Sequence, residues 1–198
     1  MPFRQVTAFG LPAVALRNAD LECLAAPAAG ALIANLRRPG GREWIVPATA
    51  PGGGWREWLD GEAPGPGTAS LYEQGGRPSL AVAWTGESGR LARDLTLDAE
   101  AALLRWRLDG SARGAEWRAV LPLTLHEVGS VSHDRAGTWV AFDARRGERL
   151  AVHVDPPDAL EVSLGPADGA PVALRLQRAT DGPEEWRVAL VVAPPDGR

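Results

Sequence analysis

The densest group of side chains that could hold a polar ligand lies in residues 52–61, Gly-Gly-Gly-Trp-Arg-Glu-Trp-Leu-Asp-Gly. This segment carries two indoles, one guanidinium and two carboxylates between glycines. An indole can stack on the apolar face of a sugar ring, while charged groups hydrogen-bond the hydroxyls around it. We therefore expect a ligand site lined by Trp55, Arg56, Glu57 and Trp58. The alternative is that the two indoles close one end of the hydrophobic core.

Arginines recur on the polar side of several runs in which apolar and polar residues alternate. The set comprises Arg105, Arg107, Arg118, Arg175 and Arg187, with His153 on a run of its own. Side chains two residues apart point to the same face of a strand, so this set lies opposite the apolar one. Guanidinium groups donate hydrogen bonds in a plane, which suits sugar hydroxyls and carboxylates. We expect Arg105, Arg107 and His153 to bind substrate if this face is open. The alternative is a solvated face whose carboxylates, such as Glu161, neutralise the arginines.

The runs that must position these side chains alternate with a period of two. They are clearest at residues 80–84, 102–108, 117–123, 150–154, 160–164, 172–176 and 186–192. Shorter strand-like runs precede them at 14–16, 21–25, 31–36 and 43–46. Turns rich in glycine, aspartate and proline separate the runs, and no segment sustains a period of 3.6 residues. The nearest helical rival, 98–104, continues the strand alternation after a turn. The sequence predicts an all-β fold, an antiparallel β-sandwich with few helices.

One segment interrupts this alternation. Glycines and prolines between residues 48 and 68 cannot sit inside a helix or a paired central strand, so we expect a long loop there. Elsewhere, tryptophans in phase with aliphatic residues are expected in the core: Trp84, Trp106, Trp117, Trp139 and Trp186. Arg93 is the exception in the run 91–97, because it stands at an apolar position.

The totals narrow the classes of protein. A chain of 198 residues fits one domain, 1–198. The net charge is −4 and no basic stripe stands out, which argues against a nucleic-acid partner. The single cysteine, Cys23, is expected to be a buried structural thiol. No secretory signal follows Met1 and no apolar run approaches about 18 residues, so we expect a cytoplasmic protein without a membrane partner. His126 and His133 lack the spacing of a zinc site, so no metal is expected.

Three early segments together form one succession of strands and turns that is punctuated by an asparagine, a proline and glycines. They are LRNADLECLAAP at 16–27, GALIANL at 30–36 and GREWI at 41–45. Two further segments, GGWRE at 53–57 and LARDLTL at 91–97, extend the pattern. Together these residues resemble the galactose-mutarotase-like family, the aldose 1-epimerases and the related sandwiches attached to glycoside hydrolases. The resemblance is confined to residues 1–125. It implies a supersandwich reduced in size, a small carbohydrate ligand and no cofactor.

The enzymes of this family interconvert sugar anomers with one general acid and one general base. The resemblance implies His126 as the acid and Glu57 or Glu185 as the base. The family's proline and aromatic residue after the histidine are replaced here by Glu127 and Val128, and the last expected strand contains no carboxylate.

Three functions therefore stay open at this point. The first is a mutarotase-like domain that binds carbohydrate without a complete catalytic set, its site including His126. The second is an active isomerase of the aldose 1-epimerase type. The third is a structural or protein-interaction sandwich, which could form a homodimer through an exposed edge strand.

Overall fold

The computed structural model describes residues 2–8, 10–29, 31–46, 53–63, 67–87, 89–125, 132–133, 139–142, 149–167, 170–178 and 182–193. Within these ranges the chain forms three antiparallel sheets and two short 3-10 helices, Pro27–Ala29 and Gly110–Gly114. None of the described residues lies in an α-helix. The predicted all-β antiparallel sandwich is confirmed.

One sheet has eight strands in the order β11-β12-β13-β16-β9-β8-β7-β6. Their bounds, in chain order, are β6 Thr68–Gln74, β7 Arg77–Gly86, β8 Gly89–Asp98, β9 Ala101–Asp109, β11 Ser132–His133, β12 Trp139–Phe142, β13 Arg149–Asp155 and β16 Glu185–Ala193. The strands β6 to β9 form a meander because each is joined to the next by a short turn. The expectation that residues 98–104 form a turn followed by a strand, and not a helix, is confirmed by the β8–β9 turn and β9.

The other two sheets have four strands each. The first has the order β1-β2-β3-β4, with bounds Phe3–Ala8, Leu11–Arg17, Glu22–Ala26 and Ala31–Arg37. The second has the order β14-β15-β10-β5, with bounds Leu160–Ala167, Ala170–Arg178, Trp117–Leu123 and Arg56–Leu59.

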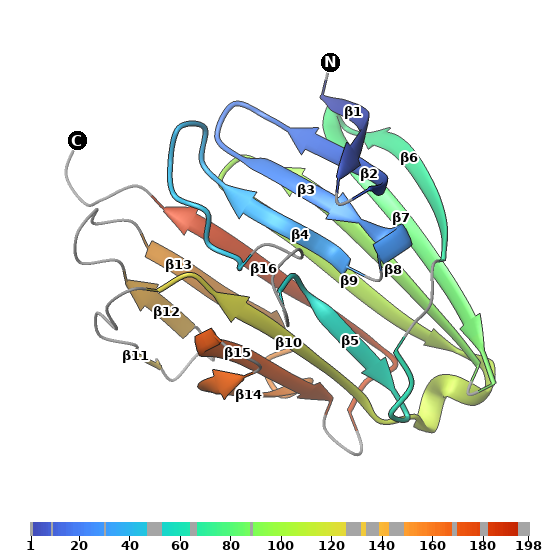
Figure 1. The fold of residues 1–198 in the computed structure, drawn as a ribbon. Coiled ribbons are helices and arrows are strands. Elements are labelled where there is room, and N and C mark those ends of the chain that lie inside the picture. Colours follow the sequence, from blue (N-terminus) through green and yellow to red (C-terminus); the bar gives the residue numbers. More distant parts are fainter. Residues whose placement is uncertain are drawn as a thin grey trace.

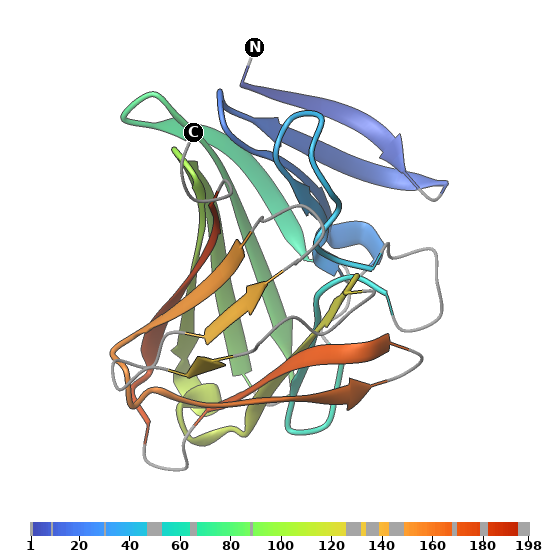
Figure 2. The same ribbon diagram turned by 90° about the vertical axis from the view of Figure 1, so that its left-hand side faces the viewer.

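The two four-stranded sheets lie side by side and together face the eight-stranded sheet (Figures 1 and 2). Backbone hydrogen bonds join their neighbouring edges: Trp55 N–H donates to the Ile33 carbonyl at 2.8 Å, and Val46 N–H donates to the Pro122 carbonyl at 3.0 Å. An isolated bridge between Ile45 and Leu123 strengthens the seam. The hydrophobic core therefore lies between one eight-stranded layer and one composite layer.

Four tryptophans fill the centre of this core. Trp106 stacks on Trp55 with ring centroids 5.3 Å apart and on Trp186 at 6.2 Å. Trp117 meets Trp186 edge-on at 5.0 Å. All four rings are fully buried, so the expectation of a core position is confirmed for Trp106, Trp117 and Trp186. Trp84 is only partly buried but packs against the same core, while the side chain of Trp139 lies outside the described residues.

The expected long loop at 48–68 is partly wrong, because it contains the strand β5. Residues 56–59 pair with β10 in the register Arg56–Val120 to Leu59–Trp117. Before the strand, Gly54 adopts a φ of 75°, which a residue with a side chain rarely tolerates, and its N–H donates to the Val46 carbonyl at 2.7 Å. The strand expected at 43–46 is reduced to isolated bridges, and β1, β6 and β11 have no counterpart among the strands expected from the sequence.

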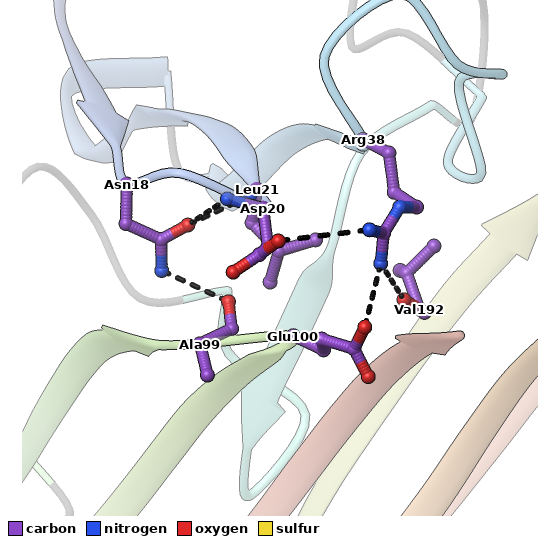
Figure 3. A network of polar contacts seen from close by, with 7 residues as sticks. All are labelled: Asn18, Asp20, Leu21, Arg38, Ala99, Glu100 and Val192. Carbon is purple, nitrogen blue, oxygen red and sulfur yellow. Dashed lines mark hydrogen bonds and ion pairs between the residues drawn. The ribbon is translucent and has the colours of Figure 1, made fainter. Parts of the chain in front are cut away.

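A polar network fastens sheet β1-β2-β3-β4 to the eight-stranded sheet at one end (Figure 3). The Asn18 amide oxygen accepts hydrogen bonds from the backbone of Asp20 and Leu21, and the amide nitrogen donates to the Ala99 carbonyl at 2.9 Å. Arg38, just after β4, donates from Nη1 to both the Glu100 carboxylate and the Val192 carbonyl at 3.1 Å. The network therefore links the β2–β3 turn to the β8–β9 turn and to β16.

Candidate functional site

Two of the four residues of the expected site, Trp55 and Glu57, lie inside the sandwich. Glu57 is 3% exposed and Trp55 is fully buried. The Glu57 carboxylate accepts hydrogen bonds from Trp55 Nε1 at 2.8 Å, from Trp106 Nε1 at 2.9 Å and from Arg93 Nη1 at 3.2 Å. Alternation along β5 turns Glu57 and Leu59 toward the core. The expectation that Trp55 and Glu57 line an open ligand site is therefore wrong.

The partner of Glu57 is the arginine that broke the apolar pattern of β8. Arg93 is 4% exposed and forms its ion pair with Glu57 inside the core. A buried charge is tolerated only where an opposite charge and hydrogen bonds compensate the lost hydration. An arginine in the apolar phase of a strand therefore indicates a buried anion, and this was the signal that could have placed Glu57 in the interior.

The other two residues of β5 that were expected in the site point outward. Arg56 and Trp58 lie on the face of sheet β14-β15-β10-β5 that is turned away from the core. The Trp58 indole is partly buried, with the Arg56 guanidinium 5.5 Å and the Arg118 guanidinium 5.2 Å from its centroid. Contacts between guanidinium groups and an indole are attractive and hold the ring in place.

Beside this indole lies a pocket of about 810 Å³ that crosses all four strands of the sheet. We call its lining the Trp58 face, defined by Trp58, Arg118, Glu161, Ser163, Arg175 and Gln177. Cross-strand register produces it: Trp58 is opposite Arg118, Arg118 is opposite Gln177, and Gln177 is opposite Glu161. The result is one row that offers an indole, a cation, an amide and a carboxylate.

The remaining predicted residues occupy a different surface, the outer face of the eight-stranded sheet. There Arg105 and His153 line a second pocket of about 700 Å³ together with Tyr72, Asp94, Asp155 and Arg187. Arg107 lies on the same face and pairs with Asp109 at 3.3 Å. We call this surface the Arg105 face. The structure therefore separates Arg105, Arg107 and His153 from Arg56 and Trp58.

Glu185 also belongs to the Arg105 face. Its carboxylate accepts two hydrogen bonds from Arg105, from Nε at 2.9 Å and from Nη2 at 2.8 Å. These bonds lower the pKa of Glu185 and raise the pKa of Arg105. A carboxylate held in this way is a weak base, because protonation would break a bidentate pair. The hydroxyl of Tyr72 has its pKa raised, first by burial and then by the neighbouring Asp94.

The two carboxylates suggested as alternatives for the base lie in different parts of the fold. Glu57 is enclosed between the layers, and Glu185 lies on the opposite side of the eight-stranded sheet from it. His126 lies outside the described residues. A general base must reach the sugar ring by hydrogen bonds, whereas the carboxylate of the buried Glu57 is bonded to Trp55, Trp106 and Arg93.

Three residues of the Trp58 face were not expected in the site. Gln177 and Ser163 lie on β15 and β14, and Glu161 was considered only as a neutralising neighbour. Their approach to Trp58 depends on β10 pairing both with β5 and with β15, strands more than a hundred residues apart in sequence. The sequence showed only that these residues alternate with apolar ones and therefore point away from the core.

The described residues include no group of three His, Cys, Asp or Glu side chains that could hold a metal ion. Among the same residues, no helix is both long and apolar enough to cross a membrane. Cys23 lies buried in β3, and burial raises the pKa of its thiol to about 12.

Comparison with solved structures finds the same sandwich fold in other proteins. The Slr1438 protein from Synechocystis sp. PCC 6803 superposes with a TM-score of 0.69 at 10% identity, over 92% of this chain and 96% of that one. HI1317 gives a TM-score of 0.62 at 10% identity, over 98% of this chain and 100% of that one. At such identities the likeness concerns the fold alone.

The same fold occurs as one part of larger enzymes. Heparan sulfate lyase HepC from Pedobacter heparinus matches 99% of this chain with 35% of its own, at a TM-score of 0.61 and 9% identity. The chain thus spans nearly all of Slr1438 and HI1317 but about a third of the lyase. No protein-family model matches the sequence. No curated protein matches it either.

Proposed function

We propose that this chain is a galactose-mutarotase-like sandwich that binds carbohydrate on the Trp58 face. The observation that carries the proposal is the row of Trp58, Arg118, Gln177 and Glu161 beside a pocket of about 810 Å³. Pockets of a few hundred to about a thousand Å³ are the usual size for small ligands. The resemblance of the early segments and the kind of proteins that share the fold support the same ligand class.

Each member of the row has a role that suits a sugar. Trp58 supplies apolar surface for the C–H groups of a pyranose. Gln177 can donate and accept at once, as a hydroxyl does, while Glu161 accepts and Arg118 donates. Ser163, in the neighbouring row on β14, adds a hydroxyl. Alternating donors and acceptors around an apolar patch are what a ring bearing several hydroxyls requires.

The proposal is for binding without anomer interconversion. Glu57 is enclosed and satisfied by two indoles and Arg93, and Glu185 is paired with Arg105 on another surface. Neither of the two carboxylates suggested as the base can therefore serve a ring bound beside Trp58.

The test is calorimetric titration of the chain with a panel of mono- and oligosaccharides, repeated with Trp58→Ala and Arg107→Ala. We expect Trp58→Ala to weaken binding about tenfold or more, which corresponds to about 1.4 kcal/mol, and Arg107→Ala, on the opposite sheet, to bind like the wild type. If none of the saccharides in the panel binds, the proposal is refuted. Loss of binding in Arg107→Ala but not in Trp58→Ala would move the site to the Arg105 face.

A further inference from the structure

The Trp58 face carries more positive than negative charge, since Arg118 and Arg175 share its pocket with one carboxylate, Glu161. Arg118 and Arg175 are both exposed and both line its pocket. Arg118 contacts the Trp58 ring, and Arg175 donates a hydrogen bond to the Pro166 carbonyl. Among the described residues, neither guanidinium forms an ion pair with a carboxylate.

On the outer face of the eight-stranded sheet, by contrast, three arginines form ion pairs with carboxylates. On the Arg105 face, Arg105 pairs with Glu185 at 2.8 Å, Arg107 with Asp109 at 3.3 Å and Arg187 with Asp155 at 3.7 Å. The whole chain carries a net charge of −4, so carboxylates are not scarce. Two arginines without ion pairs in one pocket therefore distinguish the Trp58 face from the pocket on the Arg105 face, whose arginines are all paired.

Register brings these two arginines within reach of one small anion. Arg118 is opposite Gln177 on β15, and Arg175 lies two residues before Gln177 on the same side of that strand. Such diagonal neighbours have Cα atoms about 7–8 Å apart, which long side chains can bridge. An anion between them would be held by the guanidinium fork of Arg118 and by those N–H groups of Arg175 that do not bond the Pro166 carbonyl.

The contact with Trp58 leaves the donors of Arg118 available. The contact is made to the ring and not to an acceptor atom, so it uses none of the hydrogen-bond donors of the guanidinium. Those N–H groups match the geometry of a carboxylate, sulfate or phosphate, with hydrogen bonds about twice as strong as neutral ones. The indole thus positions the cation and offers apolar surface beside it.

We propose that the ligand of the Trp58 face is an anionic saccharide, whose acidic substituent lies between Arg118 and Arg175 while its ring lies beside Trp58. This inference rests on the proposed function and specifies its ligand class. Glu161, two strands from Arg118, then accepts hydrogen bonds from hydroxyls away from the acidic group. The shared chemistry is an anionic group on a sugar ring, whether carboxylate or sulfate.

The test compares matched pairs of ligands by calorimetry: trigalacturonate against the neutral α-1,4-linked galactose trimer, and sulfated against unsulfated dextran oligosaccharides. We expect the acidic member of at least one pair to bind at least tenfold more tightly, with an affinity that falls as salt is raised. The pair that shows the preference identifies carboxylate or sulfate. Polyglutamate of similar charge serves as a polyanion without sugar rings and is expected to bind more weakly than the preferred saccharide.

The variant Arg175→Gln should remove most of this preference while leaving affinity for the neutral members nearly unchanged. The variant Arg118→Gln should also remove most of the preference, but it should weaken the neutral members as well, because Arg118 donates to ring hydroxyls in the proposed site. Arg107→Gln, on the opposite sheet, is the control and should retain the preference. Neutral members that bind as tightly as acidic ones would overturn this inference but not the proposed function. A preference that survives both variants, or polyglutamate that binds as tightly as the acidic saccharides, would also overturn it. If no member of either pair binds, and no saccharide of the earlier panel binds, the proposed function itself is refuted.

Discussion

Glu57 shows how a single residue can look functional in sequence and be structural in the fold. It stands between two tryptophans in a glycine-bounded segment, which suggests an exposed loop. In the structure two indole N–H groups and one guanidinium surround it in the core. Such a network fixes the relative positions of β5, β8 and β9, because its members come from these strands or from the residue just before β5.

We predict that Glu57→Leu lowers the free energy of unfolding by about 3–5 kcal/mol, because Arg93 is then buried without its anion. The double variant Glu57→Leu/Arg93→Leu should recover part of this loss, since neither charge remains alone. Urea unfolding, monitored by tryptophan fluorescence, measures the free energy of unfolding of both variants. A single variant as stable as the wild type would show that the network does not exist in solution.

The pair of Glu185 and Arg105 makes a prediction about pH. The pKa of Glu185 is lowered in the folded protein, so the pair stabilises the fold above the ordinary glutamate pKa of about 4.3 and ceases to do so as pH falls through the lowered value. The urea midpoint of the wild type should therefore exceed that of Glu185→Gln at pH 7, and the difference should vanish at strongly acid pH. A difference that grows on acidification would contradict this assignment. The effect should be small because the pair is largely exposed to solvent.

At the scale of elements, strands with strong alternation were predictable and short strands among glycines were not. The runs at 80–84, 102–108 and 117–123 correspond to β7, β9 and β10 because half of their residues face the core. By contrast, β5 has four residues and owes its existence to pairing with β10, sixty residues later. No local pattern specifies such a pairing. The same reason explains why the pocket beside Trp58 could not be assembled from sequence, although Trp58 itself could be singled out.

The turn that holds Asn18 joins two sheets, so its removal should weaken the contact between layers. We predict that Asn18→Ala lowers the free energy of unfolding by about 1–2 kcal/mol, because the two backbone N–H groups of the turn and the Ala99 carbonyl lose their partner. Asn18→Asp keeps the acceptor for the turn and loses only the donor to Ala99, so it should cost less. Chemical denaturation of the wild type, Asn18→Ala and Asn18→Asp measures these differences in the free energy of unfolding. Equal stability of Asn18→Ala and the wild type would refute a clamping role.

At the scale of the whole molecule, the arrangement of layers decides which residues can act together. A chain that alternates along every strand presents two outer faces and one core, and the predicted site residues are divided among all three. Trp58 and Arg56 lie on one outer face, Arg105 and Glu185 on the other, and Glu57 between the layers. The alternation of apolar and polar residues predicts whether a side chain points into the core or out to solvent. Only the strand order shows on which of the two outer faces an outward-pointing side chain lies.

This division predicts that the chain does not accelerate anomer interconversion. Polarimetry of freshly dissolved α-glucose and α-galactose should give the spontaneous rate in the presence of the protein, because the two carboxylates suggested as the base cannot reach a ring beside Trp58. A rate that rises in proportion to protein concentration would contradict this expectation. If Glu185→Gln then abolished the acceleration, the active site would lie on the Arg105 face.

The most direct test of the central claim follows the indole N–H signals of the eight tryptophans by NMR while a bound saccharide is titrated. The account predicts that the Trp58 signal shifts with ligand concentration, while those of Trp55 and Trp106, enclosed with Glu57, stay in place. Assignment by Trp58→Phe identifies the signal. Binding that leaves Trp58 unchanged, or that perturbs only residues of the Arg105 face, would contradict the claim that carbohydrate is bound on the outer face of sheet β14-β15-β10-β5.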